Sequence, residues 1–129
     1  MKGYLLDTNI ILIAPVEPAK LSRAVQTAVL DGPNFVSVVS YWEVMLKSMK
    51  GNLKIGDPRI WWRDVLQELA AMPLILTPQH VENMVYLPDI HRDPFDRTLI
   101  SQATAEDLTI VTTDREIAKY ASKNLQIIT

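Results

Sequence analysis

Tyr4-Leu5-Leu6-Asp7-Thr8-Asn9 is the stretch of sequence that decides the fold, because a short apolar run ends there in a carboxylate and two small polar side chains. An apolar run without polar alternation is typical of a strand that is buried on both faces of a parallel sheet. An ionised carboxylate beside buried residues costs several kcal/mol unless it gains a partner. We therefore expect Asp7 to lie at the carboxyl end of a strand, where a bound divalent cation would supply that partner.

Three further acids stand just after or beside strand-like runs, at the starts of helix-like ones: Glu43, Asp96 and Asp114. If the strands are parallel, three or four of these carboxylates meet at one edge of the sheet. Like charges a few ångströms apart raise one another's pKa, so such a cluster must bind cations or stay partly protonated. Asp96 precedes its strand by a whole helix, so the loop of residues 91–93 has to carry it to the same edge.

Short apolar runs alternate with stretches of helical period along the whole chain, and no repeat or linker interrupts them. Strands are expected at residues 3–6, 35–39, 74–76, 108–111 and 125–128. Helices are expected at residues 18–30, 40–49, 58–71, 79–86, 94–106 and 114–122, with a short one at 10–13. The pattern predicts an α/β fold, a three-layer α/β/α sandwich with a central parallel sheet of about five strands, as a single domain over residues 1–129.

Composition narrows the possible functions. A chain of 129 residues can bury roughly two-thirds of the surface that its unfolded form exposes, so a full core is available. The absence of cysteine excludes disulfides, zinc–thiolate sites and a cysteine nucleophile. No secretory signal is visible and no apolar run reaches the ~20 residues of a membrane span, so we expect a cytoplasmic protein without a membrane segment.

The net charge of −2 does not favour binding of nucleic acid by the molecule as a whole. A polyanion would need local help from basic side chains or from metal held by the acids. We take Lys47, Lys50 and Arg97 as possible RNA contacts, although a solvated helix face explains the basic series near residues 47–63 equally well.

The acids predict a particular metal chemistry. Oxygen ligands without cysteine or paired histidines select Mg²⁺ or Mn²⁺ over zinc. In such sites the ions fix a phosphate and acidify the attacking water, so phosphodiester hydrolysis is the natural reaction. Short polar groups beside the acids are suited to orienting a carboxylate or a water, namely Thr8, Asn9, Ser40 and Thr112, although turns or caps explain them equally well. Asp93 is a candidate fifth ligand or hydrogen-bond acceptor, but its place before Pro94 favours an N-cap.

Each acid also has a purely structural explanation. Ser40-x-x-Glu43 matches a capping box, Asp93 precedes a proline as an N-cap, and Asp114 lies in a first helical turn. Taken together, however, capping does not require acids to follow apolar strands directly. We assign no catalytic role to the two histidines, His80 and His91, and in the helix of residues 94–106 we expect Gln102 on the surface.

These motifs resemble those of the PIN-domain ribonucleases, in particular the VapC-like toxins of bacterial toxin–antitoxin pairs. The resemblance spans residues 3–129 and rests on four motifs in order: Leu6-Asp7-Thr8-Asn9, Ser37-x-x-Ser40-x-x-Glu43, His91-Arg92-Asp93-Pro94-Phe95-Asp96-Arg97 and Thr112-Thr113-Asp114. It implies a Mg²⁺- or Mn²⁺-dependent endoribonuclease that acts on RNA, a homodimer, and an antitoxin protein that covers the groove and active site. It also implies that Asp7, Glu43, Asp96 and Asp114 are the metal-binding catalytic acids.

Two other functions remain open at this point. One is a PIN-like module that binds RNA or a partner without cleaving. The other is a phosphatase of the haloacid-dehalogenase type with Asp7 as nucleophile, but that family places a second acid where Asn9 stands. Trp61 and Trp62 should point in different directions on their helix, so we expect one to reach a groove between helices 40–49 and 58–71 that receives the antitoxin.

Overall fold

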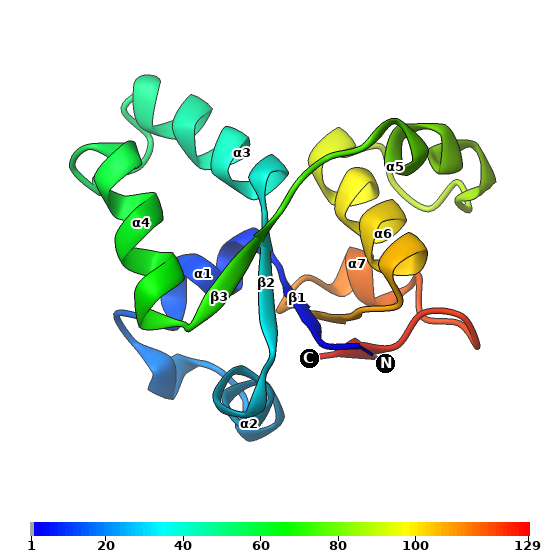
Figure 1. The fold of residues 1–129 in the computed structure, drawn as a ribbon, viewed down its shortest axis with the longest axis horizontal. Helices are drawn as coiled ribbons and strands as arrows, with labels where there is room; N and C mark the ends of the chain where they lie inside the picture. Colours follow the sequence, from blue (N-terminus) through cyan, green and yellow to red (C-terminus); the bar gives the residue numbers. More distant parts are fainter. Residues whose placement is uncertain (1) are drawn as a thin grey trace.

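A five-stranded parallel sheet forms the centre of the molecule, as the sequence predicts. The computed structural model describes residues 2–129 (Figure 1). The strands lie in the order β3-β2-β1-β4-β5. Their bounds are β1 Tyr4–Leu6, β2 Asn34–Ser37, β3 Ala71–Leu74, β4 Thr109–Val111 and β5 Ile127–Ile128.

The order of the strands reverses beside β1. The chain builds outward from β1 to β3, then returns to place β4 on the other side of β1, with Leu5 opposite Ile110. Ligands of open α/β sheets bind outside the carboxyl ends of the strands at such a reversal. Asp7 and Asp114 follow the two strands that flank this point.

Helices cover both faces of the sheet (Figure 1). The helical elements are α1 Thr8–Ile13, η1 Pro18–Lys20, α2 Arg23–Asp31, α3 Val38–Met49, α4 Pro58–Glu68, α5 Pro78–Glu82, η2 Asn83–Tyr86, α6 Pro94–Glu106 and α7 Arg115–Ala118. Leu6 packs with α1, α2 and α4, whereas Leu5 packs with α6 and α7. The predicted α/β/α sandwich is therefore confirmed.

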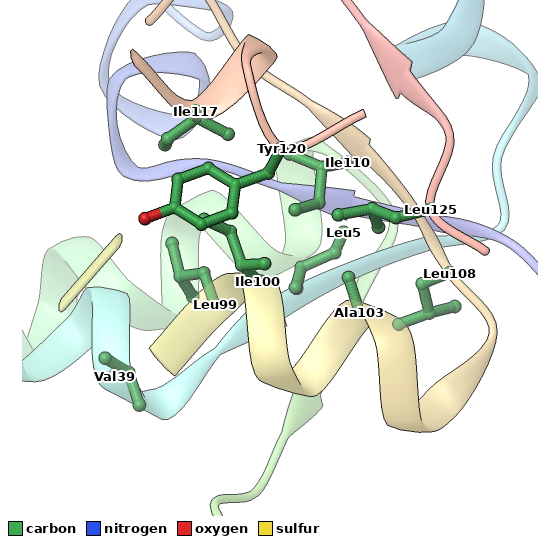
Figure 2. Packing of buried hydrophobic residues seen from close by; sticks show 10 residues of the cluster. All are labelled: Leu5, Val39, Leu99, Ile100, Ala103, Leu108, Ile110, Ile117, Tyr120 and Leu125. Carbon is green, nitrogen blue, oxygen red and sulfur yellow. The ribbon is translucent and has the colours of Figure 1, made fainter. Parts of the chain in front are cut away.

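The core beside α6 and α7 is shown in Figure 2. Leu5, Leu99 and Ile110 are almost completely buried there. Burial of each such side chain stabilises the folded state by about 1.5–3 kcal/mol relative to its exposure to water. Tyr120 packs its ring into the same cluster, and its hydroxyl oxygen points away from Leu125 (Figure 2). The ring is thus fixed by packing while its polar end remains free to bond elsewhere.

The third strand was predicted in the wrong place. It begins at Ala71, three residues before the predicted run of 74–76, and the helix expected over 58–71 ends at Glu68. Ala70 adopts a left-handed backbone with φ of 48°, which stops the helix. Pro73 lies inside β3, and an edge strand such as this tolerates proline because one side of it forms no ladder.

The start of α3 also differs from the prediction. β2 ends at Ser37, whose hydroxyl accepts a hydrogen bond from the backbone N–H of Val39 at 3.0 Å and so caps the helix. Ser40 therefore lies inside α3, and the interpretation of Ser40 and Glu43 as a capping box is wrong. Since residues three apart share a helix face, both side chains project to the same side.

α6 matches the predicted bounds of 94–106, and Asp93 caps it by accepting from the backbone N–H groups of Phe95 and Asp96. Gln102, expected on the surface, is fully buried. It accepts from the Ser37 hydroxyl at 2.6 Å and donates to the carbonyl of Ile75 at 3.2 Å. Within residues 2–129, no helix combines the length and apolar character needed to cross a membrane.

Candidate functional site

The four predicted acids line one small cavity at the carboxyl edge of the sheet. Its volume is about 150 Å³, and its wall is formed by Asp7, Thr8, Asn9, Glu43, Lys47, Asp93, Asp96 and Asp114. These residues come from the ends of β1 and β4, from α3 and from the start of α6. Larger recesses elsewhere on the molecule are predominantly apolar, so the polar chemistry is concentrated here.

Asp7 forms the buried floor of the cavity and is only 3% exposed. Its Oδ1 accepts from the backbone N–H of Thr8 and its Oδ2 from the hydroxyl of Thr112, both at 2.7 Å. Burial raises the pKa of Asp7 to about 6, and the charges of Glu43 and Asp114 add to the rise against the two hydrogen bonds. The structure therefore holds a carboxylate where its negative charge is costly.

Asp114 is fixed by the helix that it begins. Its Oδ1 accepts from the backbone N–H groups of Glu116 at 2.7 Å and Ile117 at 3.4 Å, as an N-cap does. Its own N–H donates to the Thr112 hydroxyl at 2.9 Å. Because the same hydroxyl donates to Asp7, Thr112 ties the two strand-end acids together.

Glu43 reaches the cavity from the second turn of α3. The Thr8 hydroxyl donates to Oε1 of Glu43 at 2.8 Å and lies 3.0 Å from the hydroxyl of Ser40. The ammonium of Lys47, one turn further along α3, lies 3.0 Å from Oε2. Lys47 thus supplies a positive charge at the rim of an otherwise acidic cavity.

Asp96 enters from the first turn of α6, which the preceding loop brings to this edge as expected. Its Oδ2 lies 3.2 Å from Nε2 of His91. Burial raises the pKa of Asp96 to about 7, with further contributions from the charges of Asp7 and Asp93, while the bond to His91 opposes the rise. Asp96, like Asp7, is therefore a carboxylate whose negative charge is costly, mainly because it is buried and in addition because other acids lie near it.

The remaining predicted residues differ in how they relate to the cavity. Asn9 and Asp93 line it and are exposed, and Asp93 also caps α6. Lys50 is exposed at the end of α3, outside the cavity wall. Arg97 donates through one guanidinium nitrogen to the carbonyl of Pro88, at 2.8 Å, so part of its hydrogen-bonding capacity is already used within the fold.

Sequence reasoning missed the role of two side chains at this site. The contact of Lys47 with Glu43 had a visible signal, because a pair at i and i+4 with the acid first favours an ion pair on a helix. The contact of His91 with Asp96 had none, since a loop residue five positions before an acid has no fixed geometry.

The oxygen donors of the cavity suit a hard cation. Within the described part of the chain, no three such side chains already stand in a ready-made metal site. Each acid is instead held by a hydroxyl, a backbone N–H, an imidazole or an ammonium. Burial, with a smaller contribution from neighbouring acids, raises the pKa values of Asp7 and Asp96, and Mg²⁺ or Mn²⁺ would offset the cost of the buried negative charge. In their chemistry the residues therefore fit such an ion.

The fold and this cavity define a class of protein: a parallel α/β sandwich with a carboxylate-lined cavity where the strand order reverses. The model of the PIN domain matches residues 4–123, and the chain therefore belongs to the PIN-domain family. No curated protein matches the chain.

Several solved structures share the fold. VapBC2 from Rickettsia felis, bound to a DNA fragment from its promoter, gives a TM-score of 0.71 at 16% identity, covering 97% of this chain and 96% of that one. DNA-bound VapBC from Salmonella typhimurium gives a TM-score of 0.69 at 16% identity, covering 99% of this chain and 98% of that one. A toxin–antitoxin complex from Klebsiella pneumoniae gives 0.61 at 20% identity, with 98% and 96% covered. At these identities the likeness shows the fold.

Proposed function

We propose that this chain is a metal-dependent endoribonuclease that hydrolyses RNA phosphodiester bonds as the toxin of a toxin–antitoxin pair in the cytoplasm. One observation carries the proposal: four acids from distant parts of the sequence line a single cavity beside the reversal of the strand order. Membership of the PIN-domain family supports it, as does the shared fold with toxin–antitoxin complexes.

In this proposal Asp7, Glu43, Asp96 and Asp114 hold Mg²⁺ or Mn²⁺. When bound, such a cation stabilises the charge that develops on the phosphate and acidifies an attacking water. The chain's own contribution is to place the acids. Thr112 fixes Oδ2 of Asp7, and the start of α7 fixes Oδ1 of Asp114.

Positive charge on α3 would then guide the RNA backbone. Lys47 lies at the rim of the cavity and Lys50 lies exposed at the end of the same helix. Because the chain has a net charge of −2, attraction of phosphates has to be local. Such contacts release counterions, so RNA binding should weaken as salt rises, and a flat salt dependence would count against this part of the proposal.

Cleavage assays on the full chain test the enzymatic proposal. RNA is incubated with Mg²⁺ or Mn²⁺ and the parent protein, Asp7→Asn or Asp96→Asn, and a chelator is added in a parallel reaction. We expect cleavage by the parent and by a control variant, loss of cleavage in Asp7→Asn and Asp96→Asn, and loss of the parent's cleavage when the chelator is added. Asp31→Asn is the matched control, because Asp31 is an exposed acid at the end of α2. Equal cleavage by all four proteins would reject the proposal, whereas RNA binding without metal uptake would favour a silent module.

An antitoxin is the proposed partner, and the structure changes where we expect it to bind. Trp62 stacks on Tyr41 with ring centres 4.5 Å apart, which fills part of the space between α3 and α4. Trp61 instead lines a recess of about 390 Å³ together with Ile11 of α1 and Ile60 of α4. The tryptophans do point in different directions, and we now propose the recess beside α1 and α4 as the binding place.

Co-purification with a candidate antitoxin tests this placement. Trp61→Ala should weaken the complex under conditions in which the variant remains folded, because Trp61 also packs partly against the core. Trp62→Ala should lower stability, because it removes a stacked pair, and should leave the complex intact. An unchanged complex with Trp61→Ala would remove the support for the recess. The proposed homodimer is tested separately, by sedimentation of the chain alone.

A further inference from the structure

His91 bridges one of the four acids to the hydrophobic core. Its Nε2 lies 3.2 Å from Oδ2 of Asp96, and its Nδ1 lies 3.0 Å from the hydroxyl oxygen of Tyr120. The imidazole is only 16% exposed and the Asp96 side chain 14%. A histidine that only makes the surface polar would not be enclosed in this way. The contact with Asp96 therefore indicates a structural or functional role for His91.

The hydrogen bonds around Tyr120 fix the direction of this bridge. Its hydroxyl oxygen accepts from Nη1 of Arg97 at 3.0 Å and, more weakly, from the backbone N–H of His91 at 3.4 Å. A phenol has one hydrogen to donate and two lone pairs to accept with. Since both acceptor positions face N–H groups, the phenol hydrogen is directed to Nδ1 of His91. A neutral imidazole that accepts at Nδ1 carries its proton on Nε2, which then donates to Asp96.

The far end of the bridge is rigid. The Tyr120 ring is 4% exposed and packs against the core formed with α6 and α7 (Figure 2). Nη1 of Arg97 also donates to the carbonyl oxygens of Pro88 at 2.8 Å and His91 at 3.3 Å, so it holds the loop that carries His91. The chain of donors therefore runs from Arg97 through Tyr120 and His91 to Asp96.

We propose that His91 is a positioning residue for Asp96, and that its Nε2–H sets the orientation in which this carboxylate meets a divalent cation. The inference rests on the proposed function of the cavity. Partners that orient metal-binding carboxylates through a hydrogen bond typically change metal affinity about 10- to 100-fold when they are removed.

His80 provides a contrast within the same chain. Its Nδ1 accepts from the backbone N–H of Thr77 at 3.1 Å and its Nε2 lies 3.0 Å from Oε2 of Glu106. This imidazole is also enclosed and bridged to a carboxylate, but it closes the capping box at the start of α5 and does not line the acid cavity. A histidine that only supports the fold should behave like His80.

Calorimetric titration of Mn²⁺ into the full chain, without RNA, separates the two roles. We expect His91→Leu to bind Mn²⁺ at least about 10-fold more weakly than the parent. His91→Gln should recover most of the affinity, because its amide N–H₂ reaches the place of Nε2. Tyr120→Phe keeps the ring in the core and loses the hydroxyl, so its affinity should fall between the parent and His91→Leu. His80→Gln, the matched control, should lower thermal stability and leave Mn²⁺ affinity unchanged.

Cleavage assays add a second readout. In His91→Leu the Mn²⁺ concentration for half-maximal rate should rise while the rate at saturating Mn²⁺ stays near that of the parent. Parent-like Mn²⁺ binding by both His91→Leu and Tyr120→Phe would overturn the positioning role and leave the proposed function intact. If His91→Leu does not fold, Tyr120→Phe decides by itself. A parent protein that takes up no Mn²⁺ would overturn the proposed function and this inference with it.

Discussion

The two sides of the acid cavity are built differently. On the strand side, Asp7 and Asp114 directly follow or cap regular elements and are joined through the Thr112 hydroxyl. On the helix side, Glu43 and Asp96 reach in from α3 and α6, and other side chains hold their carboxylates, namely Thr8, Lys47 and His91. Backbone N–H groups and one hydroxyl therefore fix the carboxylates of the strand pair, while side chains alone hold those of the helix pair.

This difference suggests a division of labour in the proposed metal site. The strand pair is preorganised, so it should provide the fixed part of the ligand set. The helix pair must adjust, because Glu43 is held by an ammonium 3.0 Å away that a cation would replace. Sites whose ligands are held in place before binding lose less free energy when the ion arrives.

The largest expected effect comes from removing the acids themselves. Asp7→Asn and Asp114→Asn should lower RNA cleavage roughly 100- to 1,000-fold, since several kcal/mol of charge stabilisation is lost. Glu43→Gln and Asp96→Asn should be as inactive at low Mn²⁺ but recover in part as Mn²⁺ is raised. Initial rates over a series of Mn²⁺ concentrations make the comparison. Equal recovery in both pairs would erase the distinction between the two sides.

Folding stability should depend on pH through the buried acids. The folded-state pKa of Asp7 is raised from 3.8 to about 6 and that of Asp96 to about 7, so the folded chain holds protons that the unfolded chain has released. Their stabilising contribution is complete below about pH 4 and is lost as pH rises through 6 and 7. For Asp7 alone, the free energy of unfolding at pH 8 should be lower by up to about 3 kcal/mol than it is below pH 4.

Urea unfolding with a chelator present, at pH 5 and at pH 8, measures the part of this loss that lies above pH 5, which is about 1.4 kcal/mol for Asp7. Asp7→Asn serves as the control and should show a smaller decrease between the two pH values. Mg²⁺ at pH 8 should restore stability to the parent, because the ion replaces the lost protons. If the parent loses no more stability between pH 5 and pH 8 than Asp7→Asn does, burial does not raise the pKa of Asp7.

The hydroxyl of Thr112 should contribute measurably to folding stability. Thr112→Val leaves Oδ2 of Asp7 and the N–H of Asp114 without their shared hydroxyl, which should cost about 1–3 kcal/mol of unfolding free energy. Thr112→Ser keeps the hydroxyl and should cost less. The neighbouring Thr113→Val is the matched control, because Thr113 is exposed. If the two valine variants lose equal stability in urea, the hydroxyl is not what joins the strand pair.

The smallest effect is expected at Lys47. Lys47→Met removes a positive charge beside Glu43, so Mn²⁺ should bind about 2- to 5-fold more tightly, the range expected of a solvent-screened ion pair. RNA cleavage at low salt should fall at the same time, because a phosphate contact is lost. Lys20→Met is the control, since Lys20 pairs with Glu17 on an exposed surface. Parallel changes in metal affinity for both variants would assign the effect to net charge.

Local patterns predicted most of the fold. Apolar runs located β1, β2, β4 and β5 to within a few residues, and the acid and proline at residues 93 and 94 gave the start of α6. β3 was misplaced because its start depends on the left-handed turn at Ala70 and its interior contains Pro73. The sequence does not show a positive φ at an alanine, and a proline argues against a strand unless that strand is known to lie at the edge of the sheet.

The site was predictable where it follows from strand ends and unpredictable where it depends on tertiary contacts. The positions of Asp7 and Asp114 follow from parallel strands that meet at one edge. The sequence suggests a cap at Ser40 because it does not show that α3 begins two residues earlier, at Val38. The bridge from Tyr120 through His91 joins segments 29 residues apart, and no short-range pattern encodes it.

The central claim is that folding gathers these carboxylates to hold a divalent cation. A crystal of the full chain soaked in Mn²⁺ and measured for anomalous scattering tests it directly. We predict a Mn²⁺ peak inside the cavity, bonded to oxygens of Asp7 and Asp114 and drawing in Glu43 and Asp96. A cavity without such a peak at saturating Mn²⁺, with the Glu43–Lys47 pair intact, would contradict the account.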